Sequence, residues 1–151
     1  MGSETITVLL IEDDENDVIL VELALKQAKI PVLLKSVGDG LEGLNYLNGT
    51  GQFADRHRFP LPEIIILDLK MPRMSGMEFL SYVNDHPELR IIPTIVMSAS
   101  KLDADVLRAY QLGANSFMVK PNDPATLTQM VRTIQEFWSL SEKPKPLRQL
   151  A

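Results

Sequence analysis

Two apolar runs in this chain end in carboxylates. Residues 6–11 are followed by Glu12 and Asp13, and residues 64–67 are followed by Asp68. Each run has the composition of a strand that is buried on both faces. If the two strands lie parallel, their carboxyl ends meet at one edge of a sheet and the three carboxylates crowd together. Like charges in such a group repel one another unless a divalent cation neutralises them, so the sequence predicts a Mg²⁺ site.

Two more predicted strands end in groups that suit a phosphate. The run at 92–98 closes with Ser98, and the run at 115–119 is followed by Lys120. A lysine supplies a fixed positive charge, and a serine hydroxyl donates a hydrogen bond to an anionic oxygen. A carboxylate placed between Mg²⁺ and a lysine can attack phosphorus and form an acyl phosphate. The pattern therefore favours phosphoryl transfer to Asp68.

The charges and positions of these residues predict their roles. Asp13 and Asp68 are the expected inner ligands of Mg²⁺, with Glu12 close by or acting through a water. The register of the first strand places Asp14 in the following loop or as a helix cap. Each signal is weak alone, because a single Asp after a strand is usually a turn or helix cap. Their joint occurrence at the ends of four strands favours a site.

The elements that must hold these groups alternate regularly along the chain. Strands are expected at residues 6–12, 32–37, 63–69, 92–98 and 115–119. Helices are expected at residues 15–29, 40–48, 76–85, 102–111 and 124–139. Apolar strands that alternate with amphipathic helices indicate a doubly wound α/β fold, with a five-stranded parallel sheet covered on both faces. In such folds ligands bind beyond the carboxyl ends of the strands, where the polar groups converge.

Composition limits the classes of function that remain open. With 151 residues, the chain is expected to form one domain over residues 1–139, followed by an extended or disordered tail over residues 140–151. The absence of cysteine excludes disulfides and thiolate metal sites. A net charge of −5 gives no support for nucleic-acid binding, and no apolar run is long enough to span a membrane. We therefore expect a cytoplasmic protein that binds neither nucleic acid nor membrane.

Residues 49–62 form a long connection between the second helix and the third strand. Such a connection lies at the amino-terminal edge of the strands, away from the carboxylates. Its cluster Arg56-His57-Arg58 is therefore not expected to serve the acidic site. Of the two interpretations that remain, the sequence favours a solvated loop over a partner contact.

From about residue 6 to residue 138, the chain resembles the receiver domains of two-component response regulators. The motifs that carry the resemblance are Ile11-Glu12-Asp13, Leu67-Asp68-Leu69-Lys70-Met71-Pro72 with Gly76, Ser98-Ala99, Phe117 and Lys120-Pro121. The resemblance implies a flavodoxin-like (βα)5 fold with strand order 2-1-3-4-5. It implies a phosphoryl group accepted by Asp68 and contacted by Ser98 and Lys120. It also implies that Mg²⁺ is held by Glu12, Asp13, Asp68 and the backbone carbonyl of Lys70.

The resemblance further implies how a phosphate becomes a signal. Ser98 moves toward the phosphoryl group, and Phe117 turns inward into the space that is vacated. The surface formed by helix 102–111, strand 115–119 and helix 124–139 then changes shape. The apolar residues of this surface allow a homodimer.

Within the family, three features resemble the small single-domain regulators that are paired with phytochrome histidine kinases. They are the 49–62 connection, the pair Asp39-Gly40 and the segment Leu44-Asn45-Tyr46-Leu47. The expected partner is therefore a sensor histidine kinase, and a phytochrome in particular. The 151 residues contain no DNA-reading module, so output through protein contacts is expected. The family resemblance also implies a cis Lys120–Pro121 peptide bond.

Three other functions fit part of the pattern. A phosphatase of the haloacid dehalogenase type also uses an aspartyl nucleophile, but it needs a second Asp two residues further on, where this chain has Lys70. A receiver that serves only as a binding scaffold is disfavoured, because Asp68, Ser98 and Lys120 are all present. A flavodoxin needs a hydroxyl-rich phosphate loop after the first strand, where this chain is acidic. We therefore expect a signalling module that catalyses only its own phosphoryl transfer and slow dephosphorylation.

Overall fold

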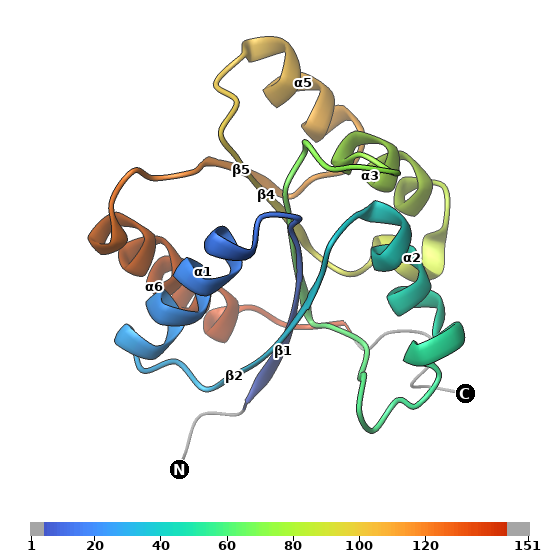
Figure 1. The fold of residues 1–151 in the computed structure, drawn as a ribbon, viewed down its shortest axis with the longest axis horizontal. Helices are drawn as coiled ribbons and strands as arrows, with labels where there is room; N and C mark the ends of the chain where they lie inside the picture. The colour runs from blue at the N-terminus through green and yellow to red at the C-terminus, as the bar shows by residue number, and fades with distance from the viewer. Residues whose placement is uncertain (1–4, 145–151) are drawn as a thin grey trace.

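The computed structural model describes residues 5–144, which contain one parallel sheet of five strands (Figure 1). The strands are β1 (Ile6–Ile11), β2 (Val32–Val37), β3 (Ile64–Leu67), β4 (Thr94–Ser98) and β5 (Ser116–Val119). The helices are α1 (Glu15–Gln27), α2 (Gly40–Asn48), the 3-10 helix η1 (Gly51–Phe53), α3 (Gly76–Asn84), α4 (Pro87–Arg90), α5 (Asp103–Gln111) and α6 (Pro124–Leu140). The strand order β2-β1-β3-β4-β5 confirms the predicted doubly wound, flavodoxin-like fold.

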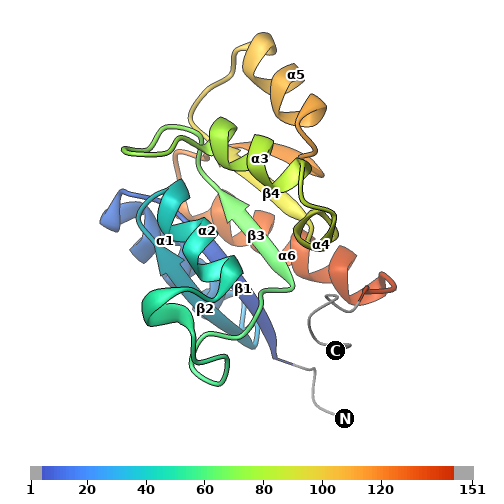
Figure 2. The ribbon, with the colours of Figure 1, turned by 90° about the vertical axis from the view of Figure 1, so that its right-hand side faces the viewer.

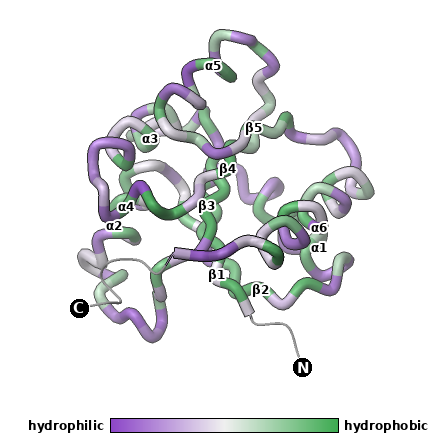
Figure 3. The backbone as a smooth tube through the Cα atoms, turned by 180° about the vertical axis from the view of Figure 1, so that it is seen from behind, coloured by the Kyte–Doolittle hydropathy of each residue, from purple (hydrophilic) through white to green (hydrophobic). Residues whose placement is uncertain are grey.

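Helices cover both faces of the sheet. In Figure 1 and Figure 2, α1 and α6 pack together on one face, and α2, α3 and α5 lie on the other. Alternate residues of β1 reach the two layers, since successive side chains of a strand point to opposite faces. Val8 and Leu10 belong to the core beneath α1 and α6, whereas Leu9 and Ile11 pack with Phe79 of α3. The central strands are accordingly hydrophobic along most of their length in Figure 3.

The register of the sheet brings the carboxyl ends of β1 and β3 side by side. Ile11 lies opposite Leu67, so the residues that follow them, Glu12 and Asp68, leave the sheet at the same level. The N–H of Asp68 donates to the carbonyl of Ile11 at 3.0 Å, which extends the strand pairing by one residue. β4 pairs with β3 on its other side, so its end reaches the same edge. The apolar runs thus position the polar groups.

The connection between α2 and β3 packs against the core, so the prediction of a solvated loop is wrong for its aromatic residues. Phe53 is buried and contacts Tyr46 of α2 and Phe59, with ring centroids 5.2 Å apart in both pairs. A loop of this length can bury aromatic side chains of its own, and residue spacing alone does not show it.

Arg56 fixes the same loop to the end of α2. Its guanidinium donates to the backbone carbonyls of Tyr46 and Leu47, at 2.8 Å each. These are among the last carbonyls of the helix, which lack partners within it. His57 and Arg58 remain exposed. The cluster of basic residues therefore has a structural part and a solvated part, and it lies away from the acidic site as predicted.

Two short helical segments, η1 and α4, are not indicated by the sequence. With three and four residues, they are too short to show a periodic pattern. α6 continues to Leu140, and the predicted tail over residues 140–151 falls mostly on residues outside the described range, so it stays a prediction. Among residues 5–144, no helix is both long and apolar enough to cross a membrane.

Candidate metal centre and phosphoryl site

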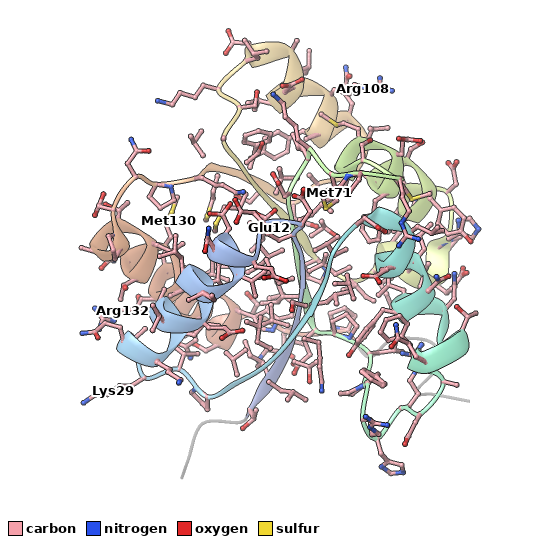
Figure 4. The ribbon with its side chains drawn as sticks, viewed as in Figure 1. Glu12, Lys29, Met71, Arg108, Met130 and Arg132 are labelled. Atoms are coloured by element: carbon pink, nitrogen blue, oxygen red, sulfur yellow. The ribbon has the colours of Figure 1, made fainter. Side chains whose placement is uncertain are left out.

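Three carboxylates meet at the carboxyl edge of the sheet, and we call them the carboxylate trio. They belong to Glu12 and Asp13 after β1 and to Asp68 after β3, and one oxygen of each lies within 4.8 Å of the others. Glu12 and Asp68 are buried and Asp13 is exposed; Figure 4 shows Glu12 where β1 gives way to α1. Asp14 caps α1, as predicted, and accepts a hydrogen bond from the N–H of Asn16 at 2.8 Å. The structure therefore brings the predicted acidic residues together.

Lys120 lies against the carboxylate trio. Its Nζ is 2.5 Å from Glu12 Oε1 and 3.5 Å from Asp68 Oδ2. A third carboxylate, Asp17 Oδ2, lies 2.8 Å from the same nitrogen. Glu12 thus contacts Lys120 directly, whereas the sequence predicts it to be near the metal or to act through a water. Lys120 is where the sequence predicts it, and Asp17 is an additional member of the site.

Asp17 has no sequence signal that sets it apart. It lies in the first turn of α1 together with Glu15. Acidic residues are common in the first turn of any helix, because they interact favourably with the helix dipole. The contact with Lys120 joins positions 103 residues apart, and only the folded arrangement of α1 beside the end of β5 reveals it.

Glu12 is the group that most needs a cation. Its side chain is buried, and its Oε2 has no hydrogen-bond partner among the described residues. Burial, together with hydrogen bonding to Asp68, raises the pKa of Glu12 to about 9. A buried carboxylate oxygen without a partner costs free energy that a bound cation would offset. The oxygen donors of the carboxylate trio suit a hard ion such as Mg²⁺.

The raised pKa of Glu12 predicts how the stability of the metal-free protein depends on pH. Its folded-state pKa of about 9 lies above its ordinary value of 4.5. Between these values the folded state keeps a proton that the unfolded state releases, so the free energy of unfolding falls as the pH rises. Urea unfolding across this pH range, without divalent ions, is expected to show the fall in wild type and a shallower fall in Glu12→Gln. If the unfolding free energy fell equally steeply with pH in the two proteins, the raised pKa would not belong to Glu12.

The Lys120–Asp17 ion pair keeps a positive charge beside Asp68. Burial acts to lower the pKa of Lys120, but its hydrogen bonds to Asp17 and Glu12 outweigh this and raise it. Burial acts to raise the pKa of Asp17, but hydrogen bonding with Glu12 and Lys120 lowers it. Both shifts favour the charged forms. Lys120 is therefore a permanent cation, and its Nζ lies 3.5 Å from Asp68 Oδ2.

The loop after β3 holds Asp68 from its backbone side. Asp68 Oδ1 accepts a hydrogen bond from the N–H of Leu69 at 2.8 Å. Gly76, the first residue of α3, lies directly against this backbone: a Cβ atom there would be 2.2 Å from the carbonyl oxygen of Asp68. Glycine is the one residue that permits so close an approach. Lys70, two residues beyond Asp68, is exposed.

A second contact fixes the same loop to the start of α2. Arg73 Nε donates to Asp39 Oδ2 at 2.6 Å, and Asp39 Oδ1 accepts from the N–H of Glu42 at 2.9 Å. The N–H of Gly40 donates to the carbonyl of Met74 at 3.0 Å. Asp39 therefore both caps α2 and anchors the β3–α3 loop. The sequence marks Asp39-Gly40 only through family resemblance and gives no sign of the pairing with Arg73.

The two predicted switch residues lie on neighbouring strands. Ser98, at the end of β4, is 1% exposed, and its Oγ accepts from the N–H of Ser100 at 3.3 Å. Among the described residues, no hydrogen bond joins Ser98 to Asp68. Phe117 is half-buried on β5, and its N–H donates to the hydroxyl of Tyr110 on α5 at 3.1 Å. Ser98 thus shares the edge of the sheet with Asp68 and is not hydrogen-bonded to it in this conformation.

The described residues contain no cis peptide bond, so the prediction of a cis Lys120–Pro121 bond is wrong. The trans form is the more stable one for an X–Pro bond, by about 0.5–1 kcal/mol. The N–H of Lys120 also donates to the carbonyl of Ser98 at 2.8 Å with the bond in this form.

Comparison with known proteins identifies the family. Residues 8–132 match the response regulator receiver domain. The chain belongs to this family. It is 34% identical over 131 residues to response regulator Rcp1 of Synechocystis sp., and the alignment covers 87% of each chain. The family resemblance predicted from the sequence is therefore confirmed.

Solved structures agree with this assignment. The phosphorylated cyanobacterial phytochrome response regulator RcpA matches this receiver domain with a TM-score of 0.85 at 31% identity, covering 94% of this chain and 100% of that chain. The Mn(2+)-bound form of response regulator Rcp1 matches with a TM-score of 0.81 at 32% identity, and the match covers 93% of this chain and 99% of that chain. This receiver domain is thus similar to phytochrome-associated regulators, as predicted.

Proposed function

We propose that Asp68 accepts a phosphoryl group from a sensor histidine kinase in a Mg²⁺-dependent reaction. The observation that carries this proposal is the place of Asp68 beside the other two carboxylates of the trio and beside the Lys120 ammonium, whose Nζ is 3.5 Å from Asp68 Oδ2. Membership of the receiver family supports it, because response regulators act with sensor histidine kinases. The similarity to cyanobacterial phytochrome response regulators favours a phytochrome as the kinase.

The proposed transfer forms one bond and breaks one. A carboxylate oxygen of Asp68 attacks the phosphorus of a phosphohistidine, and an O–P bond forms as the P–N bond breaks. The leaving nitrogen keeps the electron pair. Lys120 lies where it can neutralise charge on the equatorial oxygens, which is the main task of a protein in phosphoryl transfer. Ser98, at the adjacent strand end, offers a hydroxyl donor once it turns toward the phosphoryl group.

We propose Mg²⁺ as the ion of this site, with the carboxylate trio and the backbone carbonyl of Lys70 as its protein ligands. When bound, it would supply further neutralisation of the phosphoryl oxygens. The unpartnered Oε2 of Glu12 supports the presence of an ion, because a cation gives this buried oxygen a partner. The exposed Asp13 leaves one side of the site open, which an incoming phosphate requires.

We propose that the signal leaves the site through Ser98 and Phe117 and reaches the surface of α5, β5 and α6. This surface carries exposed apolar side chains, among them Leu102 (67%), Leu107 (59%) and Tyr110 (47%). A shift from 1:99 to 99:1 between two conformations needs about 5.5 kcal/mol of differential interaction. Hydrogen bonds to a charged phosphoryl group contribute about 1.5–3 kcal/mol each, so a few of them suffice. The apolar side chains suit a homodimer or a downstream protein.

The extent of the signalling module, its location and its class of partner complete the proposal. We propose that residues 1–139 form the signalling module and that it acts in the cytoplasm through protein contacts. A net charge of −5 supports protein partners over nucleic acid. The module's chemistry is limited to its own phosphoryl transfer and slow dephosphorylation.

Acetyl phosphate tests the proposed chemistry without a kinase. Incubated with acetyl phosphate and Mg²⁺, the wild-type protein is expected to gain the mass of one phosphoryl group, and EDTA is expected to prevent the gain. Hydroxylamine should then remove the group, since it cleaves acyl phosphates. A protein that gains no phosphoryl mass, or gains it equally in EDTA, contradicts the proposal.

A further inference from the structure

Asp17 is a charged residue that touches the site and lies outside the carboxylate trio. Its Oδ2 accepts a hydrogen bond from Lys120 Nζ at 2.8 Å. The side chain of Asp17 is 33% exposed and that of Lys120 is 23% exposed, so the pair lies at the rim of the site. The contact joins the first turn of α1 to the segment that follows β5. Asp17 thus lies next to both Lys120 and Glu12, and its ion pair is with Lys120.

The donors of Lys120 are divided among three carboxylates. An ammonium group has three N–H donors. Two of them bond to Glu12 and Asp17, and the nearest acceptor for the third is Asp68 Oδ2 at 3.5 Å. A phosphoryl group on Asp68 needs this third donor. The ammonium must therefore stay where the other two bonds hold it.

Of the two residues that hold Lys120, Glu12 has a competing task. It belongs to the carboxylate trio, and its Oε2 has no hydrogen-bond partner among the described residues. A divalent cation bound by Oε2 would draw charge away from Oε1 and so weaken its bond to Lys120. Asp17 lies outside the carboxylate trio, so its bond to Lys120 meets no such competition. It is the anchor that a bound metal would leave unweakened.

We propose that Asp17 is a positioning residue, which keeps the Lys120 ammonium beside Asp68 while Glu12 serves the metal. The inference rests on the proposed function of Asp68. Loss of the Asp17 carboxylate is expected to weaken the binding of a phosphoryl group and to leave the binding of Mg²⁺ nearly unchanged. The ion pair is only part-buried and Lys120 keeps its bond to Glu12, so the stability of the protein should change little.

Beryllofluoride, which mimics a phosphoryl group on a carboxylate, separates these effects. In saturating Mg²⁺, Asp17→Ala is expected to bind beryllofluoride about tenfold more weakly than wild type, and to bind Mg²⁺ alone within about twofold of wild type. Glu15→Ala is the matched control, because Glu15 is exposed, lies in the same helical turn and carries the same charge. It should bind both probes as wild type does. Asp17→Glu keeps the carboxylate and should recover most of the affinity.

A second readout follows the lysine itself. In protein labelled with ¹⁵N at lysine, an ammonium held by ion pairs gives an observable Lys120 signal because its protons exchange slowly. We expect wild type to keep this signal when Mg²⁺ is added, and Asp17→Ala to lose it. A structural role of Asp17 alone would not produce this dependence on Mg²⁺.

The outcomes separate the role of Asp17 from that of Asp68. Equal affinities of wild type and Asp17→Ala for beryllofluoride would overturn the role of Asp17 and leave the function of Asp68 intact. A parallel loss of Mg²⁺ affinity would make Asp17 a metal ligand, which also overturns it. If wild type accepts neither acetyl phosphate nor beryllofluoride, the proposed function fails and this inference falls with it.

Discussion

Asp68→Asn is expected to abolish phosphorylation by acetyl phosphate. A neutral amide has no anionic oxygen to attack phosphorus, so no acyl phosphate can form. The substitution preserves the shape of the side chain, and its oxygen can still accept the hydrogen bond from the N–H of Leu69. Intact mass is the measurement: the variant should show no phosphoryl gain under conditions in which wild type is fully modified.

Asp85→Asn is the matched control for this loss. Asp85 is exposed at the end of α3 and lies outside the carboxylate trio, so the variant should be phosphorylated as wild type is. The fold of Asp68→Asn should also persist. Asp68 is one of the groups that raise the pKa of Glu12, so its neutralisation relieves repulsion and should leave the metal-free protein at least as stable. If Asp68→Asn were phosphorylated to the same extent as wild type, the acceptor would be a residue other than Asp68.

Gly76→Ala is expected to destabilise the fold and to slow phosphorylation together. The added Cβ would lie 2.2 Å from the carbonyl oxygen of Asp68 and 2.7 Å from the Cα of Leu69. Both are backbone atoms, so the chain itself must move. Overpacking of this kind costs about 3 kcal/mol of unfolding free energy. The movement displaces Asp68 from Lys120, so the rate of phosphorylation should fall even at temperatures where the variant is folded.

Gly38→Ala provides the control for the loss of a glycine. A Cβ there would meet nothing closer than 3.7 Å, an ordinary contact with the side chain of Glu42. Measured by urea unfolding, the loss of unfolding free energy relative to wild type should therefore be several-fold larger for Gly76→Ala than for Gly38→Ala. If Gly76→Ala is no less stable than Gly38→Ala and reacts at the wild-type rate, the close packing of α3 against the Asp68 backbone is not required.

The ends of the strands, and with them most of the candidate site, could be predicted from the sequence. An apolar run shows where a buried strand stops, and in a parallel sheet all strands stop at the same edge. The pairing of Ile11 with Leu67 is the physical reason that Glu12 and Asp68 meet. Lys120 reaches them because the strand that precedes it ends at this edge too. Neither step needs knowledge of side-chain contacts.

Contacts between distant segments could not be predicted in this way. Asp17 and Lys120 meet across α1 and the end of β5, and the acidic residue by itself is an ordinary first-turn residue. The buried aromatic contacts of Phe53 and the carbonyl contacts of Arg56 depend on how the 49–62 connection folds back on α2. A periodic pattern reports which face of an element is buried, and it is silent on which partner covers that face.

The position of the phosphoryl group is the most direct measurement of the central claim. Wild-type protein that has gained one phosphoryl group from acetyl phosphate is treated with borohydride, which reduces an aspartyl phosphate to homoserine, and is then digested and mapped by mass spectrometry. We expect a single homoserine, at position 68. A homoserine at Asp13 or at another aspartate, a 5-hydroxynorvaline at Glu12 or at another glutamate, or no homoserine at position 68 in protein that carries the phosphoryl mass, would contradict the account.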